Sequence, residues 1–600
     1  MKFKQFAGKF VEFYRNFWKA ITILLLLTLL GQALNLIAPY IYGKILDALV
    51  AGKSAKDIML VAVLSLGVYT LQTMVVDRYF YWYNINKLRI DAHQYISEKT
   101  LDKVMTFSVG QDINQNSGVK QDVITRGEHS VATITNTLLY EVFPVVIQVI
   151  LFSAALFFIN LKLGFVVLAG MIAHLAANIY INCKFKEEAG QIEEKEIDNN
   201  KIRSEILRNI ETVKLNSQEE RVISEYREDS FTVNNLSKKL WSKYTLYSSC
   251  RDMIIGLTKF AVIATGAVCY SNGSCSAGDL LIFFSWSSSA LGKMTSIGTI
   301  QRILMTAYAS VKNYFVMMDV EPDVRIVSNP VKPGKYLGQI EFKNVSFVYP
   351  KRNYIEEKNK KETKLFEGRH EALSNANFII RAGQKAAFVG HSGSGKSTII
   401  KLLMRAYDPT AGQILIDGHD LRLLDLRDFR NSVGIVEQQI LLFDNTLRYN
   451  ITFPLNGKSE LVSDEMLDKV SRLSRVSEFY HRLENGFDTI IGERGVKLSG
   501  GQCKRVGIAR ALIKDPSILI LDEATSDLDA QNDAIIQQAM KEVAKERTTI
   551  IIAHRLSTIK DADKIFVVNG GKIVGEGKHA ELMKSCFEYQ NLVHSQVHVF

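Results

Sequence analysis

Long apolar runs without charge fill the first half of this 600-residue chain and limit what it can fold into. The four clearest runs are Ala20–Gly43, Ile58–Val76, Val142–Leu161 and Leu163–Cys183. Each has roughly the 20 residues that an α-helix needs to cross a bilayer. Two weaker runs follow, Met253–Tyr270 with Lys259 inside it and Leu280–Leu304 with Lys293 inside it. We therefore predict an all-α membrane domain of six helices over residues 1–320.

The polar connections between these runs indicate which side of the membrane they face. Asn84–Asn136 and Lys184–Ser249 are long and rich in Lys and Arg, as is the N-terminus, and the net charge is +10. Because basic residues accumulate on the cytoplasmic side, we expect helical extensions that project into the cytoplasm. No cleavable signal peptide is evident. The expected location is the plasma (inner) membrane, with multiple spans.

The N-terminal segment shows a helical period. Phenylalanines recur every three or four residues, so that they share one face, at Phe3, Phe6, Phe10, Phe13 and Phe17. This pattern predicts a helix lying in the membrane interface. A short amphipathic core helix is the alternative.

A second domain follows a proline-containing linker, residues 321–338. Strand-like and helix-like stretches alternate from residue 339 to residue 600, as in an α/β domain. Ala386–Val389 is apolar and leads into a glycine-rich loop with the pattern G-x-x-x-x-G-K-[ST]. Its residues are Gly390, His391, Ser392, Gly393, Ser394, Gly395, Lys396, Ser397 and Thr398. The pattern predicts that ATP binds here, with Lys396 on the phosphates and Ser397 on Mg²⁺.

Two further segments complete a nucleotide site. The apolar run Ser517–Leu521 ends in Asp522, expected in the Mg²⁺ shell, and Glu523, expected to polarise the attacking water. A second glycine-rich helix start, Ser499, Gly500, Gly501 and Gln502, is also suited to an anion. Because one phosphate loop is already present, we expect this second loop to cap the nucleotide of another copy.

These motifs, in this order, resemble the ATP-binding cassette (ABC) superfamily, specifically half-transporters of the exporter fold. The resemblance implies a six-helix membrane domain followed by a P-loop NTPase cassette. Thr125–Gly127 and Glu211–Lys214 resemble the branch that exports heavy metals and glutathione conjugates. Asn209–Lys214 and the region Phe107–Gly118 resemble the two coupling segments that join the membrane domain to the cassettes.

The resemblance also implies roles for single residues. Tyr349 would stack on adenine, Gln438 would contact Mg²⁺, and His554 would contact the γ-phosphate. The two cassettes would meet at Ser526–Asp529, and the family's usual proline is replaced by Ile440. Glu523 and the family's signature loop, which Ser499–Gln502 matches, are both intact. Two equivalent sites in a homodimer are therefore expected.

The implied function is ATP-driven transport, in the export direction, of a small or amphiphilic substrate. A lysine within a span faces protein or water, so Lys259 and Lys293 favour an anionic substrate, with His174 a third candidate contact. The lysines are structural instead if Glu141 or Asp252 pairs with them. The cargo could be a small molecule, a lipid or a peptide, and no nucleic-acid partner is expected.

Some alternatives remain. An importer built on the exporter fold and an ATP-gated channel would share this architecture, whereas the apolar spans exclude a soluble DNA-repair ATPase. Cys269 and Cys275 bracket a short turn and are expected to be free thiols, with a disulfide as the alternative. The charged segment Lys351–Glu371 is longer than the usual family connection and is interpreted as a solvated insertion.

Overall fold

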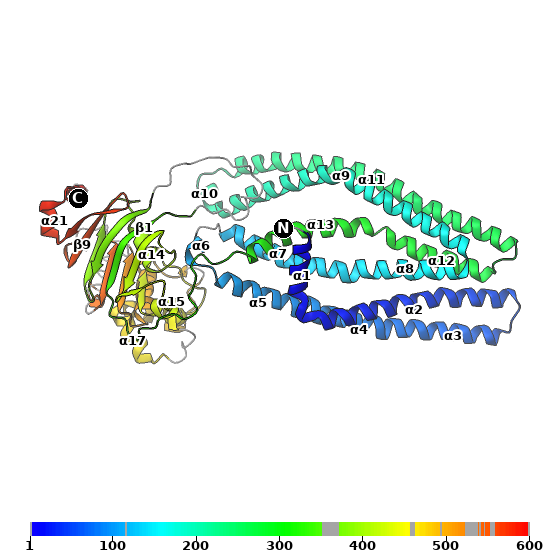
Figure 1. The fold of residues 1–600 in the computed structure, drawn as a ribbon, viewed down its shortest axis with the longest axis horizontal. Helices are drawn as coiled ribbons and strands as arrows, with labels where there is room; N and C mark the ends of the chain where they lie inside the picture. The colour runs from blue at the N-terminus through cyan, green and yellow to red at the C-terminus, as the bar shows by residue number, and fades with distance from the viewer. Residues whose placement is uncertain are drawn as a thin grey trace. The chain divides into compact units, whose positions relative to one another are not determined.

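The structure is a computed structural model, and it divides into two compact units. One consists of Met1–Lys103 and Gly118–Asp319, and the other of Val104–Ser117 and Val320–Phe600. The structure describes residues 3–113, 117–350, 371–455, 462–492, 495–522, 538, 542–544, 547–552 and 559–597. The first unit consists of long helices, and the second contains the β-sheets (Figure 1).

Helices of the first unit run almost without interruption. They are α1 (Phe3–Tyr14), α2 (Trp18–Val50), α3 (Ala55–Leu71), α4 (Arg78–Tyr83), α5 (Ala92–Met105), α7 (Ser117–Thr137), α8 (Phe143–Ile159), α9 (Leu161–Arg208), α10 (Ile210–Leu215), α11 (Glu219–Ser271), α12 (Ala277–Met294) and α13 (Ile297–Met318). Three π-helical segments join consecutive α-helices of this unit end to end, namely η2 (Gln72–Asp77), η3 (Asn84–Asp91) and η4 (Leu138–Val142).

Five helical stretches among the described residues are long and apolar enough to cross a membrane. They are Gln5–Val50, Ile58–Met105, Val123–Ile159, Leu161–Arg208 and Glu219–Ser271. The sixth predicted span is divided, because α12 ends at Met294 and α13 begins at Ile297. The molecule is a multi-pass membrane protein by these helices, and the count of six spans stays a prediction.

A side-chain cap explains where one membrane helix ends and the next begins. Asn160 is extended, and its Oδ1 accepts from the backbone N–H groups of Lys162 and Leu163, so that one helix stops and α9 starts. With 48 and 53 residues, α9 and α11 are about 72 and 80 Å long. A bilayer core is only about 30 Å thick, so both must extend well beyond it. The predicted second coupling segment forms the short helix α10 between them.

Helix α1 differs from its predicted environment. Phe6 and Phe13 are buried, and Phe6 lies 4.7 Å from Tyr308 and 5.7 Å from Phe315, measured between ring centroids. The aromatic face therefore packs on α13, as the core-helix alternative expects. Lys9 adds an ion pair to Asp319 at the end of α13.

Within the described residues, the second unit holds two sheets. One has the order β2-β1-β4-β5 and is antiparallel, and the other has the order β10-β9-β3-β8-β7-β6 and is mostly parallel. The strands are β1 (Ile340–Phe347), β2 (Leu373–Ile380), β3 (Lys385–Val389), β4 (Ala411–Ile416), β5 (His419–Asp420), β6 (Val433–Val436), β7 (Ile518–Asp522), β8 (Thr548–Ile552), β9 (Lys564–Asn569) and β10 (Lys572–Gly577).

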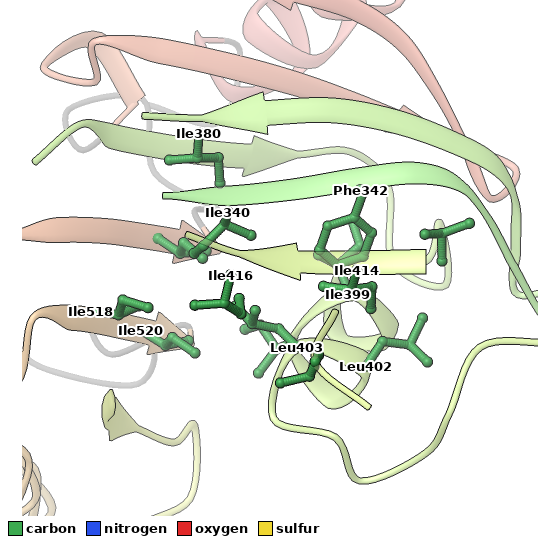
Figure 2. Packing of buried hydrophobic residues seen from close by; sticks show 14 of the residues in the cluster. Ile340, Phe342, Ile380, Ile399, Leu402, Leu403, Ile414, Ile416, Ile518 and Ile520 are labelled. Carbon is green, nitrogen blue, oxygen red and sulfur yellow. The ribbon is translucent and has the colours of Figure 1, made fainter. Parts of the chain in front are cut away.

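The second unit also contains α-helices. They are α6 (Val109–Ile113), α14 (Lys396–Leu403), α15 (Leu426–Asn431), α16 (Leu447–Thr452), α17 (Asp464–Leu473), α18 (Gly500–Leu512), α21 (His579–Ser585) and α22 (Phe587–Val597). Ile340, Phe342 and Ile416 of the antiparallel sheet meet Ile399 and Leu403 of α14 in one core (Figure 2). This packing fixes α14, and with it the loop that precedes it.

One close helix approach in the membrane unit gives a prediction. An added Cβ at Gly127 of α7 would overlap the Tyr314 side chain of α13, whereas at Gly67 of α3 it would meet open space. Gly→Ala normally stabilises a helix by about 0.5–1 kcal/mol. We expect Gly127→Ala to destabilise the protein by about 1–3 kcal/mol through overpacking, while Gly67→Ala does not. Thermal unfolding of the detergent-solubilised chain measures both, and equal melting temperatures would contradict the packing.

Candidate functional site

The carboxyl ends of four parallel strands lie at one edge of the larger sheet. Their order is β3, β8, β7 and β6, and the pairs Phe388–Ile552, Ile552–Asp522 and Leu521–Val436 are in register. The loops that follow these strands must therefore start side by side. In the sequence, β3 is followed by the predicted phosphate loop, β8 by His554, β7 by Glu523 directly after its last residue Asp522, and β6 by Gln438.

The glycine-rich loop links β3 to α14 through strained backbone positions. Gly390, Gly393 and Gly395 have φ values of 155°, 78° and 112°. A side chain at Gly390 would overlap the Val568 carbonyl oxygen, and one at Gly395 would approach the Ala372 carbonyl oxygen to 2.7 Å. Only glycine fits both constraints. Glycine at these positions keeps side chains off the backbone, as a loop that binds phosphate through its N–H groups requires.

The side chain of Lys396 is held by carbonyl oxygens of this loop. Its Nζ donates to the carbonyl oxygens of Gly390 at 2.8 Å and His391 at 3.0 Å, and the residue is 5% exposed. Ser397 next to it is exposed, and the hydroxyl oxygen of Ser394 is buried without a hydrogen-bond partner among the described residues. A fixed cation, an accessible hydroxyl and a free buried hydroxyl fit a phosphate ligand.

Oxygen ligands suited to Mg²⁺ come from three predicted residues. Ser397 supplies a hydroxyl, Gln438 an amide oxygen and Asp522 a carboxylate, and Mg²⁺ prefers oxygen ligands. Gln438 is exposed just after β6, and Asp522 ends β7. Glu523, His554, Ser526–Asp529 and most of the insertion Lys351–Glu371 lie outside the described residues.

The Gln438 loop is tied to helix α18. Arg510 donates to the carbonyl oxygens of Leu441 at 2.8 Å and Asn450 at 2.9 Å. Burial lowers the pKa of Arg510 from its ordinary value, and the Glu437 carboxylate opposes that shift. Ile440, in place of the family's proline, packs against Gly507, where an added Cβ would come 2.6 Å from its Cδ1. The loop therefore rests on α18.

The second glycine-rich segment forms the exposed start of α18. The Ser499 hydroxyl accepts from the Gln502 N–H at 3.3 Å, and Gln502 Oε1 accepts from the Ser499 N–H at 2.8 Å. This capping box leaves Gly500 exposed with open space around it. A helix start of this kind, with no acidic residue in its first turn, favours an anion.

Tyr349 connects the phosphate loop to the first coupling segment. Its hydroxyl lies 3.1 Å from the Thr398 hydroxyl, and its ring centroid lies 5.4 Å from that of Tyr407. The Tyr407 hydroxyl in turn donates to the Gly110 carbonyl oxygen at 3.0 Å, and the Gly110 N–H donates to the Ala406 carbonyl oxygen at 3.1 Å. The predicted adenine-stacking residue and helix α6 thus share one aromatic neighbour.

Sequence reasoning missed three residues of this contact. Gly110 lacks a side chain because one would overlap the Tyr407 ring, and Tyr407 was not singled out. Gln111 is 2% exposed, and its amide donates to the Glu321 carbonyl oxygen at 2.8 Å and accepts from the Asp323 N–H at 3.2 Å. The position of Gly110 and Gln111 inside Phe107–Gly118 was a signal for these two residues, and no sequence signal pointed to Tyr407.

Of the three predicted substrate residues, Lys259, Lys293 and His174, the membrane unit buries His174 alone. His174 is fully buried, and its Nε2 lies 3.6 Å from Asp252 Oδ1, which also accepts from Arg251 at 3.0 Å. His174 therefore packs between α9 and α11. Among the described residues, neither Lys259 nor Lys293 forms an ion pair, so that Asp252 and Glu141 do not neutralise them.

The predicted turn cysteines are free thiols. Cys269 lies near the C-terminus of α11, and Cys275 lies just before α12. No disulfide joins the two cysteines. Asn160 Nδ2 donates to Cys275 Sγ at 3.5 Å. The amide of Asn160 therefore serves both the helix start of α9 and this turn.

Comparison with known proteins decides the family. Residues 373–526 match the family model described as ABC transporter, and residues 21–294 match the ABC transporter transmembrane region. The chain belongs to the ABC transporter family. The identification of an exporter-fold half-transporter, with the membrane domain fused to one ATPase cassette, is confirmed.

Individual relatives agree over nearly the whole length. ABC transporter B family member 6 of Dictyostelium discoideum is 32% identical, covering 94% of this chain and 82% of that protein. The ATM1-type heavy metal exporter of Novosphingobium aromaticivorans is 31% identical, covering 93% and 89%. A solved bacterial Atm1-family ABC exporter with ATP bound is 30% identical, with a TM-score of 0.81 over 96% of this chain and 98% of that one.

These findings confirm an ATP-hydrolysing transporter that exports across a membrane. The cassette family implies ATP binding, while the Mg²⁺ site and the roles of single residues stay predictions.

The geometry of Lys396 generates a prediction. Lys396→Ala removes the cation held by the glycine-rich loop and should weaken ATP binding by roughly 10- to 100-fold, as loss of a charged hydrogen bond implies. Lys343→Ala, an exposed change on β1, serves as the control and should bind normally. Fluorescence titration with a labelled ATP analogue measures both, and similar affinities for the two variants would refute the assignment.

Proposed function

We propose that two copies of this chain form a homodimer with two equivalent Mg²⁺–ATP sites, each shared between the copies. The observation that carries this proposal is the exposed, self-capped start of α18, an anion-binding helix end that the phosphate loop of the same chain does not need. Ser499–Gln502 of one copy would close over the nucleotide held by Lys396 of the other.

Each residue has a distinct task in this site. Lys396 and the N–H groups of Gly390–Thr398 bind the β- and γ-phosphates, and Tyr349 stacks on adenine. Ser397, Gln438 and Asp522 hold Mg²⁺, which neutralises phosphate charge when bound. Glu523 orients and polarises the attacking water, and His554 contacts the γ-phosphate. Loss of the γ-phosphate contacts after hydrolysis releases the two cassettes from one another.

The remaining architecture follows the sequence predictions. We propose six membrane helices, the sixth formed by α12 and α13, within a membrane domain of residues 1–320. A linker over 321–338 leads to a cassette over 339–600 on the cytoplasmic side of the plasma (inner) membrane. Binding of two ATP molecules favours one of two membrane conformations, and α6 and α10 transmit this preference.

The substrate we propose is an anionic amphiphile, on the strength of Lys259 and Lys293. Neither lysine has an ion-pair partner among the described residues, and a homodimer would double them. An unpaired ammonium group is costly inside a membrane, so an anionic partner is expected to arrive from outside the chain. His174 is buried and is no longer part of this proposal.

Mixed dimers test the shared site. Lys396→Ala disables a phosphate loop, and Gly500→Glu places an anion on the exposed start of α18. If sites are shared, a dimer of one Lys396→Ala chain and one Gly500→Glu chain keeps one intact site, while either homodimer keeps none. We expect one occluded nucleotide per mixed dimer after vanadate trapping, counted with labelled ATP.

The alternative arrangement gives the opposite count. If each chain completed its own site, both chains of the mixed dimer would be defective and no nucleotide would be occluded. Wild-type chains assembled by the same procedure, with two occluded nucleotides, serve as the control for assembly.

The lysine proposal predicts a change in substrate preference. Lys259→Met together with Lys293→Met should lower transport of acidic amphiphiles into inside-out proteoliposomes by roughly tenfold, the loss of one charged contact. Transport of neutral amphiphiles should persist. Lys162→Met, at the start of α9, is the control. Unchanged transport of the acidic compounds would refute the proposal.

A further inference from the structure

A cavity of about 620 Å³ lies in the membrane unit, and Lys259, Lys293 and His174 are not among the residues that line it. We call it the interface cavity. The residues of its wall that matter here are Tyr81, Asn84, Arg89, Asn136, Tyr140 and Glu141, with Ile303 of α13 closing one side. The wall therefore combines one cation, one carboxylate, two amides and two phenol rings.

The cavity lies at the depth where apolar runs end. Ile58–Val76 stops shortly before Tyr81, and Val142–Leu161 starts directly after Glu141. Exposed aromatic residues mark the same level, because Tyr79, Tyr81 and Trp82 are 54%, 54% and 50% exposed. Such aromatic belts lie at the boundary between hydrocarbon and water. The polar head of an amphiphile would be at this depth.

Polar groups of the cavity lack partners in the part of the chain that the structure describes. Asn84 is 1% exposed, and its Nδ2 has no hydrogen-bond acceptor. Arg89 and Glu141 form no ion pair there. By contrast, Lys87 and Asp91, on the same segment as Arg89, pair with each other at 2.7 Å. A buried free amide is unusual and points to a missing ligand.

Backbone geometry brings these groups together. Asn84 and Arg89 lie on the π-helical segment η3, and Tyr140 and Glu141 lie on the π-helical segment η4. π-Helical turns occur frequently at functional sites. Two of them face one cavity, from segments that are about 50 residues apart in the chain.

We propose that the interface cavity binds an amphiphile whose head group carries a phosphate beside a primary ammonium. Arg89, with the amides of Asn84 and Asn136, takes the phosphate. Glu141 takes the ammonium, together with the rings of Tyr81 and Tyr140, whose centroids are 6.0 Å apart. An anionic head without an ammonium would leave Glu141 unpaired, and a cationic head would leave Arg89 unpaired. Lys259 and Lys293 are not part of this wall.

Binding to the full-length chain in detergent, without nucleotide, tests the proposal. Native mass spectrometry would count bound short-chain phosphatidylethanolamine against phosphatidylglycerol of the same acyl length. We expect a preference for phosphatidylethanolamine of roughly tenfold. Arg89→Gln should weaken binding of both lipids by roughly tenfold, while Glu141→Gln should remove the preference.

Three more variants separate charge recognition from damage to the fold. Lys87→Gln and Asp91→Asn change charges on η3 outside the cavity and should keep the wild-type preference. Glu141→Lys should reverse the preference toward phosphatidylglycerol, a gain that a misfolded chain cannot give. Equal binding of both lipids by the wild type, or the same preference in Glu141→Lys, would overturn the proposal.

Free phosphoethanolamine distinguishes the source of the ligand. If it displaces the lipid, the head group alone suffices and a soluble ligand can supply it. If it does not, the acyl chains contribute and the ligand is a lipid. Both results support the proposed head-group chemistry. Because no ATP is present, a negative outcome leaves the shared nucleotide site untouched.

Discussion

The in-register pairing of the parallel strands β3, β8, β7 and β6 is the constraint on which the nucleotide-handling half depends. Because all four strands run the same way, their following loops must begin at one edge of the sheet. Motifs that are more than 100 residues apart in the sequence are thus brought together by backbone hydrogen bonds alone. The loop glycines are then required by close neighbours in space, such as the Val568 carbonyl oxygen, which leaves no room for a side chain at Gly390.

Helix α18 carries a second kind of constraint. Its start is exposed, and the reciprocal hydrogen bonds between Ser499 and Gln502 cap it from within the helix itself. The same helix supports the Gln438 loop through Arg510 and through Gly507 against Ile440. A shift of α18 that followed an anion at its start would therefore move the Gln438 loop as well.

The sequence was sufficient to predict short motifs, whereas contacts between residues far apart in the chain became visible only in the structure. The phosphate loop and Ser499–Gln502 are short motifs whose chemistry is complete within a few residues. The contact between Gly110 and Tyr407 joins residues 297 apart, and no local pattern signals it. The period of the N-terminal phenylalanines correctly indicated a shared helix face, but a period cannot tell whether lipid or α13 covers that face. The break between α12 and α13 was missed because Thr295 and Ser296, which separate the two helices, are neither charged nor proline or glycine.

Charged side chains in the membrane unit fall into two groups, those with an ion-pair partner and those without one. Arg251 is buried, and it is satisfied by Asp252, Asn178 and Ser248 at 2.9–3.0 Å, so it stabilises the pairing of its helix with α9. Arg89 and Glu141 share a cavity wall and have no ion-pair partner among the described residues. Burial does not force Arg89 to pair, because this residue is exposed, but Asn84 on the same wall is 1% exposed and its Nδ2 has no acceptor among the described residues. A ligand with a phosphate on Arg89 and Asn84 and an ammonium on Glu141 would satisfy all three groups.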